Sequence, residues 1–286
     1  MSPKKPDDVV RAWRESAPYW EKHGDTVRLM FEPMTRALIE DADVTDGMKV
    51  LDIAGGAGEP SLTLAQIVGS MGSVTCTDIV AEMVSAAEHQ AARFGLTNMK
   101  FCQCAADALP FDDETFDAAV CRLGAMFFPD PLAALREMLR VTKLRGRVAL
   151  AVWHNNESNP FFSVVTDILS HYIGSPPEDT PAPGAFRFAE PGALRQILEK
   201  AGAIRVRERV FEFRIAAPLS PEEFWTLRSE MSETVREKLA RLGTEQRKRA
   251  QQEAIEAARP FFAQDQMSFP AKAIIISGAK QTGNKV

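Results

Sequence analysis

VLDIAGGAGEP, residues 50–60, joins an apolar run typical of a buried strand to a loop that contains three glycines, and a helical pattern begins near Ser61. Glycine lets the backbone approach a ligand closely and adopt left-handed conformations. A helix that starts after the loop directs its free N–H groups toward it. Doubly wound folds bind ligands at such places, beyond the carboxyl ends of the strands. The stretch therefore predicts a ligand-binding loop, and we expect the carboxylate of Asp52 to point toward it.

Strand-like and helical patterns alternate from this stretch onward. Strands are expected at residues 49–53, 73–77, 99–104, 116–121 and 147–153. Helices are expected between them, at residues 61–69, 81–94 and 132–142. Strands that alternate with helices need crossover connections. The pattern therefore predicts an α/β protein whose mostly parallel sheet is covered on both faces.

The flanking regions are mainly helical. In the first forty residues, apolar side chains recur at helical spacing, which predicts two or three helices broken near Pro18 and Pro33. After Trp153 the patterns predict a helix, a Pro/Gly-rich loop, a second short helix, a strand, charged helices and a last strand. The two helices are expected at residues 160–173 and 190–203, with the loop between them. The strand is expected at residues 205–215, the charged helices at 220–263 and the last strand at 271–280.

Composition narrows the class of protein. The chain has 286 residues, of which 45% are hydrophobic and 26% charged, as in soluble globular enzymes. A formal net charge of -5 argues against a nucleic-acid partner. Residues 1–10 have no apolar core of a signal peptide, and no apolar run reaches the ~18 residues of a membrane span, so a cytoplasmic location is expected. No histidine lies near the Cys102 and Cys104 pair, so no metal site is expected.

The glycine loop departs from the nicotinamide dinucleotide fingerprint. That fingerprint is G-x-G-x-x-G, whereas here Gly56-x-Gly58 leads to Ser61. A carboxylate at Asp52 would also repel a pyrophosphate. It would suit a ligand that carries a positive charge or an amine. S-adenosyl-L-methionine has an α-ammonium and a sulfonium and no phosphate, so it is the favoured cofactor.

Two more acidic residues follow the next two strand-like runs. Asp78 ends SVTCTD, where a carboxylate can accept from both ribose hydroxyls, and Asp107 lies in CAADALPF, where it can accept from the adenine amino group. The backbone of Ala106 and Ala108 would frame the adenine edge, and Met83 would pack on its face. Each acid alone has another interpretation, Asp78 as a helix cap and Asp107 as a turn residue. Three acids at the ends of three successive strands favour the cofactor site.

Residues 50–153 resemble the class I S-adenosylmethionine-dependent methyltransferases, and more narrowly the small-molecule branch related to ubiquinone/menaquinone C-methyltransferases. VLDIAGGAGEPSLTLA resembles the family's glycine motif, TDIVAEMVSAA its ribose-binding acid, and AADALPFDDETFDAAVCR its adenine segment and fourth strand. CRLGAMFFPDPLAALREMLRVTKLRGRVALAVW resembles its following loop, helix and fifth strand. Two departures are Ala54, where the family usually has glycine, and KLRGR, where LRPGG is commoner. An alanine is tolerable at position 54 if its φ is negative.

The resemblance implies a three-layer α/β sandwich with a seven-stranded, mostly parallel sheet, an antiparallel last strand, and a Rossmann-like methyltransferase fold under a helical lid. One catalytic domain would have five segments. They are a helical cap (1–46), the cofactor-binding core (47–153), a lid insertion with a helix and the sixth strand (154–219), a helical insertion (220–265), and the last strand and tail (266–286).

The resemblance also implies the residues of the cofactor site, with Tyr19 closing over the methionine end. The expected cofactor-binding residues are Tyr19, Asp52, Ala54, Gly56, Gly58, Asp78, Ile79, Met83, Ala106, Asp107, Ala108, Cys121 and Leu123. The product would be S-adenosyl-L-homocysteine.

Methyl transfer from a sulfonium is an in-line displacement, in which the protein mainly contributes proximity, alignment and, where needed, a base. His154, just after the fifth strand, is the first candidate for a base, although it can instead be a capping or solvent-facing residue. His23, in the amino-terminal helices expected to cover the cofactor, is the second candidate. Phe127, Trp153 and Phe161 are expected to line a pocket for a hydrophobic or aromatic small acceptor, or else to form the core of the lid.

Two alternative functions stay open: a methyltransferase-fold protein that binds without turnover, and an NAD(P)-dependent oxidoreductase. The sequence is compatible with a monomer or a homodimer.

Overall fold

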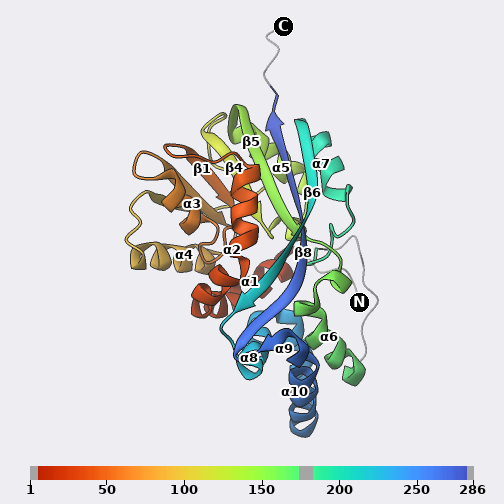
Figure 1. Cartoon of the computed structure of the whole chain (residues 1–286). Helices are drawn as coiled ribbons and strands as arrows, with labels where there is room; N and C mark the ends of the chain where they lie inside the picture. The colour runs from red at the N-terminus through yellow and green to blue at the C-terminus, as the bar shows by residue number, and fades with distance from the viewer. Residues whose placement is uncertain (1–5, 174–182, 282–286) are drawn as a thin grey trace.

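A mixed sheet with the order β3-β2-β1-β4-β5-β8-β6 forms the centre of the computed structural model, which describes residues 6–173 and 183–281 (Figure 1). Its strands are β1 (Lys49–Ile53), β2 (Ser73–Asp78), β3 (Met99–Gln103), β4 (Phe116–Arg122), β5 (Thr142–Trp153), β6 (Ala203–Ala217) and β8 (Gln266–Lys280). Strands β1 to β5 pair in parallel, and β8 runs antiparallel to both β5 and β6. The predicted seven-stranded sheet with an antiparallel last strand is confirmed. The two-residue strand β7 (Phe262–Ala263), which pairs with β8, was not predicted.

Helices cover both faces of this sheet. The strand order reverses between β1 and β4, so right-handed crossovers place α3 (Ser61–Val68) and α4 (Ala81–Arg93) on one face and α5 (Pro131–Val141) on the other. Helix α7 (Ala193–Ala201) packs beside α5. The long helix α2 (Gly24–Asp41) covers β4, β5, β8 and β6 on the face of α3, as the predicted sandwich requires.

The amino-terminal helices break at one place that the sequence did not indicate. Helix α1 (Pro6–Lys22) runs through Pro18 and α2 runs through Pro33, so the prediction of breaks near these prolines was wrong. The chain turns at His23, between the two helices. The carbonyl that Pro18 leaves unpaired belongs to Arg14, an exposed residue where water can bind it. Burial of Ala17 and of the α2 face outweighs the loss of single hydrogen bonds.

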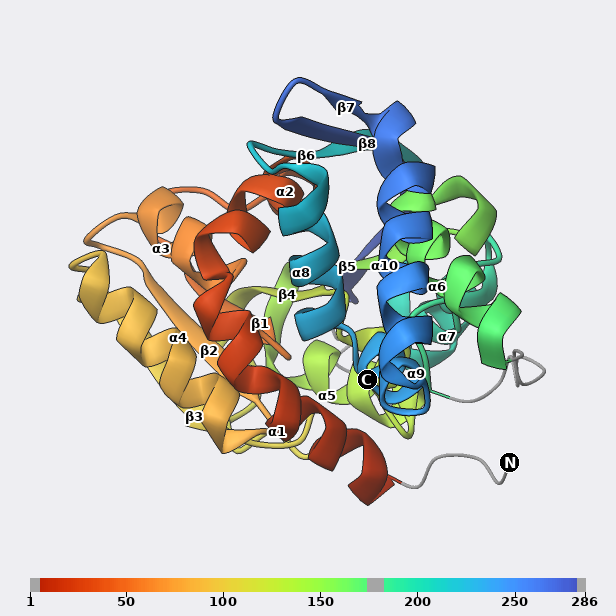
Figure 2. The same ribbon diagram turned by 90° about the horizontal axis from the view of Figure 1, so that it is seen from below.

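A helical lid lies over the carboxyl ends of the parallel strands (Figure 2). It consists of α1 together with α6 (Pro160–Ile173), α8 (Pro221–Met231), α9 (Glu233–Ala240) and α10 (Thr244–Ala258). In the described part of the chain, three short 3-10 turns lie at Ala125–Phe127, Asn156–Ser158 and Arg259–Phe261. Strands β6 and β8 extend beyond the other strands toward α8 and α9 (Figure 1). The predicted Pro/Gly-rich loop falls largely on residues 174–182, outside the described residues.

The start of α8 is specified locally. Ser220 caps the helix by accepting from the Glu223 N–H, and the Glu223 carboxylate accepts in return from the Ser220 N–H across 2.8 Å. Pro221 occupies the first turn, where its missing N–H costs nothing. This reciprocal cap fixes where α8 begins and therefore which of its side chains face the sheet.

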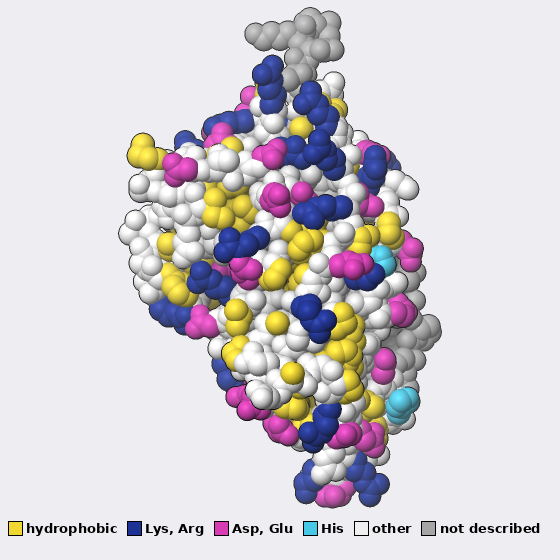
Figure 3. All heavy atoms as spheres, in the orientation of Figure 1, with side chains coloured by type: hydrophobic (Ala, Val, Ile, Leu, Met, Phe, Trp, Pro, Cys, Tyr) yellow, Lys and Arg dark blue, Asp and Glu magenta, His cyan; other side chains and the backbone are white. Residues whose placement is uncertain are grey.

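The surface of the described chain mixes both signs of charge. On the face shown in Figure 3, basic and acidic side chains are intermixed, which is typical of a solvated surface. In residues 6–173 and 183–281, no helix combines the length and the apolar character that crossing a bilayer requires.

Candidate active site

A cavity of about 620 Å³ opens beneath the lid at the carboxyl ends of β1, β2 and β4. This volume is typical of small-molecule sites. The strand order reverses between β1 and β4, which is where doubly wound folds bind ligands. The wall comes from the glycine loop, the ends of β2 and β4, the loop after β3, and helices α1, α2, α6 and α8.

Left-handed backbone conformations shape the glycine loop. Ala54 and Gly56 both have a φ of 55°. A Cβ added at Gly56 would meet nothing within 4 Å, so this residue presents bare backbone to the cavity. The condition of a negative φ, under which an alanine would be tolerable at position 54, is therefore not met. The methyl group of Ala54 is accommodated because residue 124 is glycine; a Cβ there would lie 2.5 Å from that of Ala54.

Asp52 lies behind the loop and not on the cavity wall. Its carboxyl group is fully buried, and Oδ2 accepts from Ser61 Oγ across 2.6 Å. A Cβ at Gly55 would come within 2.8 Å of the same oxygen, so Gly55 separates the carboxyl group from the cavity. Burial raises the pKa of Asp52 to about 7, although the Ser61 hydrogen bond and the charge of Arg122 oppose the shift. Asp52 therefore shapes the loop from behind. Its carboxyl group does not reach the cavity, where the expected contact with a ligand cation would be made.

Asp78 lies on the cavity wall at the end of β2, as expected for a ribose-binding acid. Its Oδ2 accepts from the Gly56 N–H across 3.1 Å and its Oδ1 from the Val80 N–H across 2.9 Å. Burial raises the pKa of Asp78 to about 6. A carboxylate can accept about four hydrogen bonds, so acceptor capacity remains for a ligand. Ile79 and Met83 flank it on the same wall.

The loop after β3 brings Ala106 and Asp107 to the wall, whereas Ala108 does not line the cavity. Leu123, after β4, lines it with a φ of 63°. The other two expected contacts are also set back from the cavity. Cys121 is fully buried in β4, and Gly58 faces Leu62, whose Cδ1 would lie 3.2 Å from an added Cβ.

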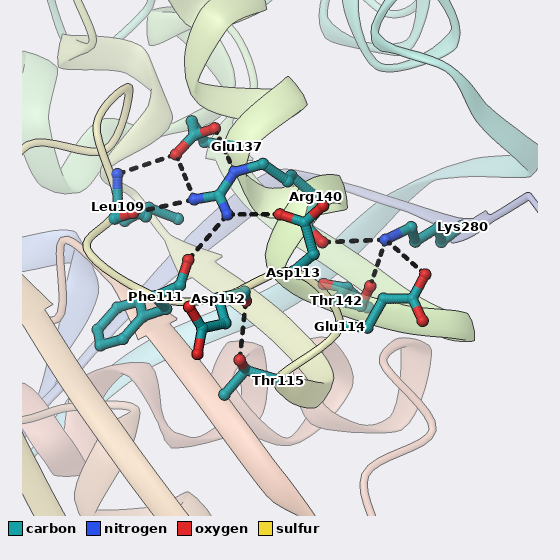
Figure 4. Close-up of polar contacts among 10 residues, drawn as sticks. All are labelled: Leu109, Phe111, Asp112, Asp113, Glu114, Thr115, Glu137, Arg140, Thr142 and Lys280. Atoms are coloured by element: carbon teal, nitrogen blue, oxygen red, sulfur yellow. Dashed lines mark hydrogen bonds and ion pairs between the residues drawn. The ribbon is translucent and has the colours of Figure 1, made fainter.

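Arg140 on α5 fastens the loop that carries Asp107 (Figure 4). Its guanidinium donates to the carbonyls of Leu109 and Phe111 across 2.9 and 2.8 Å, and to Asp113 across 2.8 Å. Glu137 pairs with Arg140 and accepts from the Leu109 N–H across 3.0 Å. These hydrogen bonds lower the pKa of Glu137. The loop is therefore held from a helix, although it contains no regular structure of its own.

Tyr19 does not line the cavity; its ring lies 5.1 Å from the guanidinium carbon of Arg236. Trp13 and Trp20 of the same helix line it instead. The indole N–H of Trp20 is buried without a partner among the described residues. Helix α1 therefore covers the cavity as expected, but through tryptophans that the sequence did not single out.

Neither candidate base lies on the wall. The backbone N–H of His154 donates to the carbonyl of Lys272, and the ring Nδ1 of His154 is buried without a partner among the described residues. The ring of His23 lies 2.6 Å from a carboxylate oxygen of Glu230 on α8. The structure thus places both histidines in contacts between elements, away from the cavity.

The predicted aromatic pocket residues Phe127, Trp153 and Phe161 all line the cavity. Trp153, at the end of β5, packs against Phe31 and Phe162 with ring centroids 5.6 and 4.9 Å apart. The cavity is therefore aromatic on the side where β5 ends.

Three arginines that the sequence did not single out also line the cavity: Arg28, Arg122 and Arg228. Arg28 Nε lies 3.2 Å from Glu59 Oε1. Arg122 donates to Thr35 across 2.7 Å and to the Glu59 carbonyl across 3.0 Å. Arg228 could have been found from the sequence, because it follows Phe224 by four residues and therefore lies on the same, apolar face of α8.

A family model described as methyltransferase domain matches residues 44–202. The chain belongs to this methyltransferase domain family. The ubiquinone/menaquinone biosynthesis C-methyltransferase UbiE of Cellvibrio japonicus is 40% identical over 139 residues, which are 48% of this chain and 55% of that protein. The chain thus spans about half the length of the curated relatives it matches.

Solved structures share the fold of this methyltransferase-family chain. YcgJ of Bacillus subtilis has a TM-score of 0.56 at 21% identity, over 88% of this chain and 100% of that one. Phosphoethanolamine N-methyltransferase 2 of Haemonchus contortus, solved with S-adenosyl-L-methionine, has a TM-score of 0.56 at 16% identity, over 96% of this chain and 60% of that one. At these identities the likeness concerns the fold alone.

In the described part of the chain, no three His, Cys, Asp or Glu side chains are grouped to hold a metal ion.

Proposed function

We propose that this methyltransferase-family chain transfers a methyl group from S-adenosyl-L-methionine to a small, apolar or aromatic acceptor. The observation that carries the proposal is the wall formed by Gly56 and Asp78, where bare backbone and a carboxylate with free lone pairs face one cavity. The similarity to UbiE over residues of the core supports the same reaction class.

The residues on the wall fit this cofactor. Asp78 would accept from the ribose hydroxyls, Asp107 would accept from the adenine amino group, and Met83 would pack on the base. Gly56 leaves room for close approach of the methionine part. The cofactor would supply a methyl group activated by its sulfonium. The carboxylates of Asp78 and Asp107 on the wall disfavour the pyrophosphate of a nicotinamide dinucleotide, the alternative cofactor.

Catalysis would then rest on position. With both candidate histidines away from the wall, the chain's contribution is to align the acceptor against the methyl group and to exclude water. Trp153, Phe161 and Phe162 provide an apolar surface at the end of β5 for this purpose. Acceptors whose nucleophilic atom ionises easily, such as quinols and phenols, suit such a site.

Isothermal titration with S-adenosyl-L-methionine, S-adenosyl-L-homocysteine and NADH tests the cofactor. Micromolar binding of the first two and none of the third is the expected result. Binding of NADH alone would overturn the assignment.

Turnover separates an enzyme from a binding protein of the same fold. Incubation with quinol and phenol acceptors is expected to produce S-adenosyl-L-homocysteine together with a product in which a methyl group replaces a proton, so that mass spectrometry shows a gain of one CH2 unit. Cofactor binding without product for any acceptor class would favour the binding protein. We also propose a cytoplasmic location, no nucleic-acid partner, and a monomeric or homodimeric state.

A further inference from the structure

Arg228 is a buried cation on the cavity wall without an anionic partner. Its side chain is 6% exposed, and it projects from α8 into the lining of the cavity. Its Nε atom is fully buried and has no hydrogen-bond partner, and no ion pair involves its guanidinium within the described residues. The other two arginines of the wall, Arg28 and Arg122, have partners. Arg228 is therefore the wall cation whose charge is not compensated by the described fold.

Aromatic rings hold this guanidinium in place. Its central carbon lies 4.9 Å from the ring centroid of Phe161 and 5.0 Å from that of Phe162. Phe162 in turn packs on Trp153 at the end of β5. The capped start of α8 and these two rings orient the side chain, so the fork of N–H donors is preorganised before any ligand enters.

The charge persists at neutral pH. Burial lowers the pKa of Arg228 to about 10, and no acidic side chain acts on it in the opposite direction. Taking an unpaired charge out of water is costly unless hydrogen bonds or a counter-ion compensate it. Cation–π contacts with two phenylalanines supply only part of that compensation. A ligand that brings a negative charge would supply the rest.

We propose that Arg228 binds a carboxylate of the methyl acceptor, so that the acceptor class is an apolar or aromatic monocarboxylic acid. This inference rests on the proposed function, because it takes the bound acid to be the methyl acceptor. A guanidinium matches a carboxylate in a bidentate arrangement. Arg228 is the one wall arginine without an ion-pair or hydrogen-bond partner for its guanidinium among the described residues. A single cation among aromatic side chains suits a monoanion, whereas a phosphate dianion would leave a charge uncompensated in the same apolar surroundings.

The place of Arg228 separates this carboxylate from that of the cofactor. The cofactor-side residues follow β1, β2 and β3, whereas Arg228 stacks on Phe162, which packs on Trp153 at the end of β5. Strands lie ~4.8 Å apart, and β4 lies between β1 and β5. The acceptor carboxylate would thus lie on the β5 side, with the body of the acid on Phe162 and Trp153.

Binding to matched pairs of probes tests the proposal without turnover. Cinnamate and phenylacetate are compared with their uncharged amides by tryptophan fluorescence titration and thermal unfolding, with and without S-adenosyl-L-homocysteine. The proteins are the unaltered chain, Arg228→Met, Arg228→Lys and, as a control, Arg241→Met, which removes an exposed charge from the same lid. Each acid is expected to bind the unaltered chain at least about tenfold more tightly than its amide. Arg228→Met should remove this preference, Arg228→Lys should reduce it, and the control should retain it.

Thermal unfolding distinguishes a ligand site from a structural cation. Because the unpaired charge is costly, Arg228→Met is expected to unfold at the same or a higher temperature without ligand. A lower unfolding temperature together with an unchanged acid preference would overturn the proposal. Equal binding of acids and amides, or no binding of either acid to the unaltered chain, would also overturn it.

Cofactor binding is measured separately in the same variants. An unchanged affinity of Arg228→Met for S-adenosyl-L-homocysteine is expected; a loss would assign the guanidinium to the cofactor carboxylate and overturn the acceptor site. If the unaltered chain does not bind S-adenosyl-L-homocysteine, the proposed function fails. The acid preference without that ligand then still decides whether Arg228 binds a carboxylate.

Discussion

The backbone N–H of Gly56 donates to Oδ2 of Asp78 across 3.1 Å, which joins the glycine loop after β1 to the end of β2. The same carboxyl group accepts from the Val80 N–H through its other oxygen. One side chain therefore sets the position of the loop and also faces the cavity. A change at Asp78 should affect ligand affinity more than it affects the rest of the fold.

Asp78→Asn is expected to weaken S-adenosyl-L-homocysteine binding by about tenfold or more, because an amide has one acceptor oxygen for the two ribose hydroxyls and the loop. Isothermal titration measures the change. Asp112→Asn, in an exposed part of the loop after β3, is the matched control and should bind like the unaltered chain. Equal affinities of all three proteins would contradict the assignment of the ribose acid.

The affinity for S-adenosyl-L-homocysteine should fall as the pH drops below about 6, because burial raises the pKa of Asp78 to about 6 and only the ionised carboxylate accepts through both oxygens. Titrations between about pH 5 and 8 measure the profile. In Asp78→Asn the fall near pH 6 should be absent. A profile that is the same in both proteins would assign the titration to another group.

The stability of the ligand-free chain should decrease as the pH rises through 7. Burial raises the pKa of Asp52 from 3.8 to about 7, so between these values the folded chain binds more protons than the unfolded one. The free energy of unfolding therefore falls with rising pH in this range and levels off above it. Urea unfolding at about pH 5 and 8 measures the difference. Asp52→Asn should reduce this difference in the free energy of unfolding. An undiminished difference would show that other groups cause the pH dependence.

Ala54→Gly should raise the free energy of unfolding by roughly 0.5 kcal/mol, since relief of the left-handed conformation exceeds the added entropy of the unfolded chain. Ala57 in the same loop has a negative φ and is the control. Ala57→Gly should lower the free energy of unfolding by about 0.5–1 kcal/mol. Chemical denaturation of both variants gives the comparison, and equal losses would refute the role of the Ala54 backbone.

Arg140→Ala should destabilise the fold by ~1–2 kcal/mol and also weaken S-adenosyl-L-homocysteine binding, because the loop with Asp107 loses its anchor on α5. Arg136→Ala, exposed on the same helix, is the control. Unfolding and titration experiments separate the two effects. Lost stability with unchanged affinity would mean that the anchor does not position Asp107.

The sheet was predictable because its strands alternate with helices and end in turn residues. β1 was predicted with its observed bounds, Lys49–Ile53, since a charged residue and a glycine loop delimit it. β6 and β8 are longer than predicted, because their pairing with each other continues beyond the core. The helices continue through Pro18 and Pro33, because their packing outweighs the loss of the one backbone N–H donor that each proline lacks.

Site residues were predictable where their position depends on chain order alone. Asp78 and Asp107 follow strands whose ends meet at one edge of the sheet. Side-chain direction was harder to predict. Tyr19 and Trp20 are adjacent, but one residue turns an α-helix by about 100°, so only one of them faces the cavity. The apolar helix position of Arg228 could be read from the sequence, but its lack of a partner could not, because a sequence does not display contacts.

The position of β8 between β5 and β6 has a consequence for biosynthesis. Both neighbours precede β8 in the chain, so when they leave the ribosome their inner edges have no partner. The nascent chain carries these unpaired edges until residues 266–280 emerge, and unpaired edges recruit other chains. Completion of the sheet is thus delayed until nearly all of the described chain has been made, and a nascent chain stalled before β8 should be a target for chaperones.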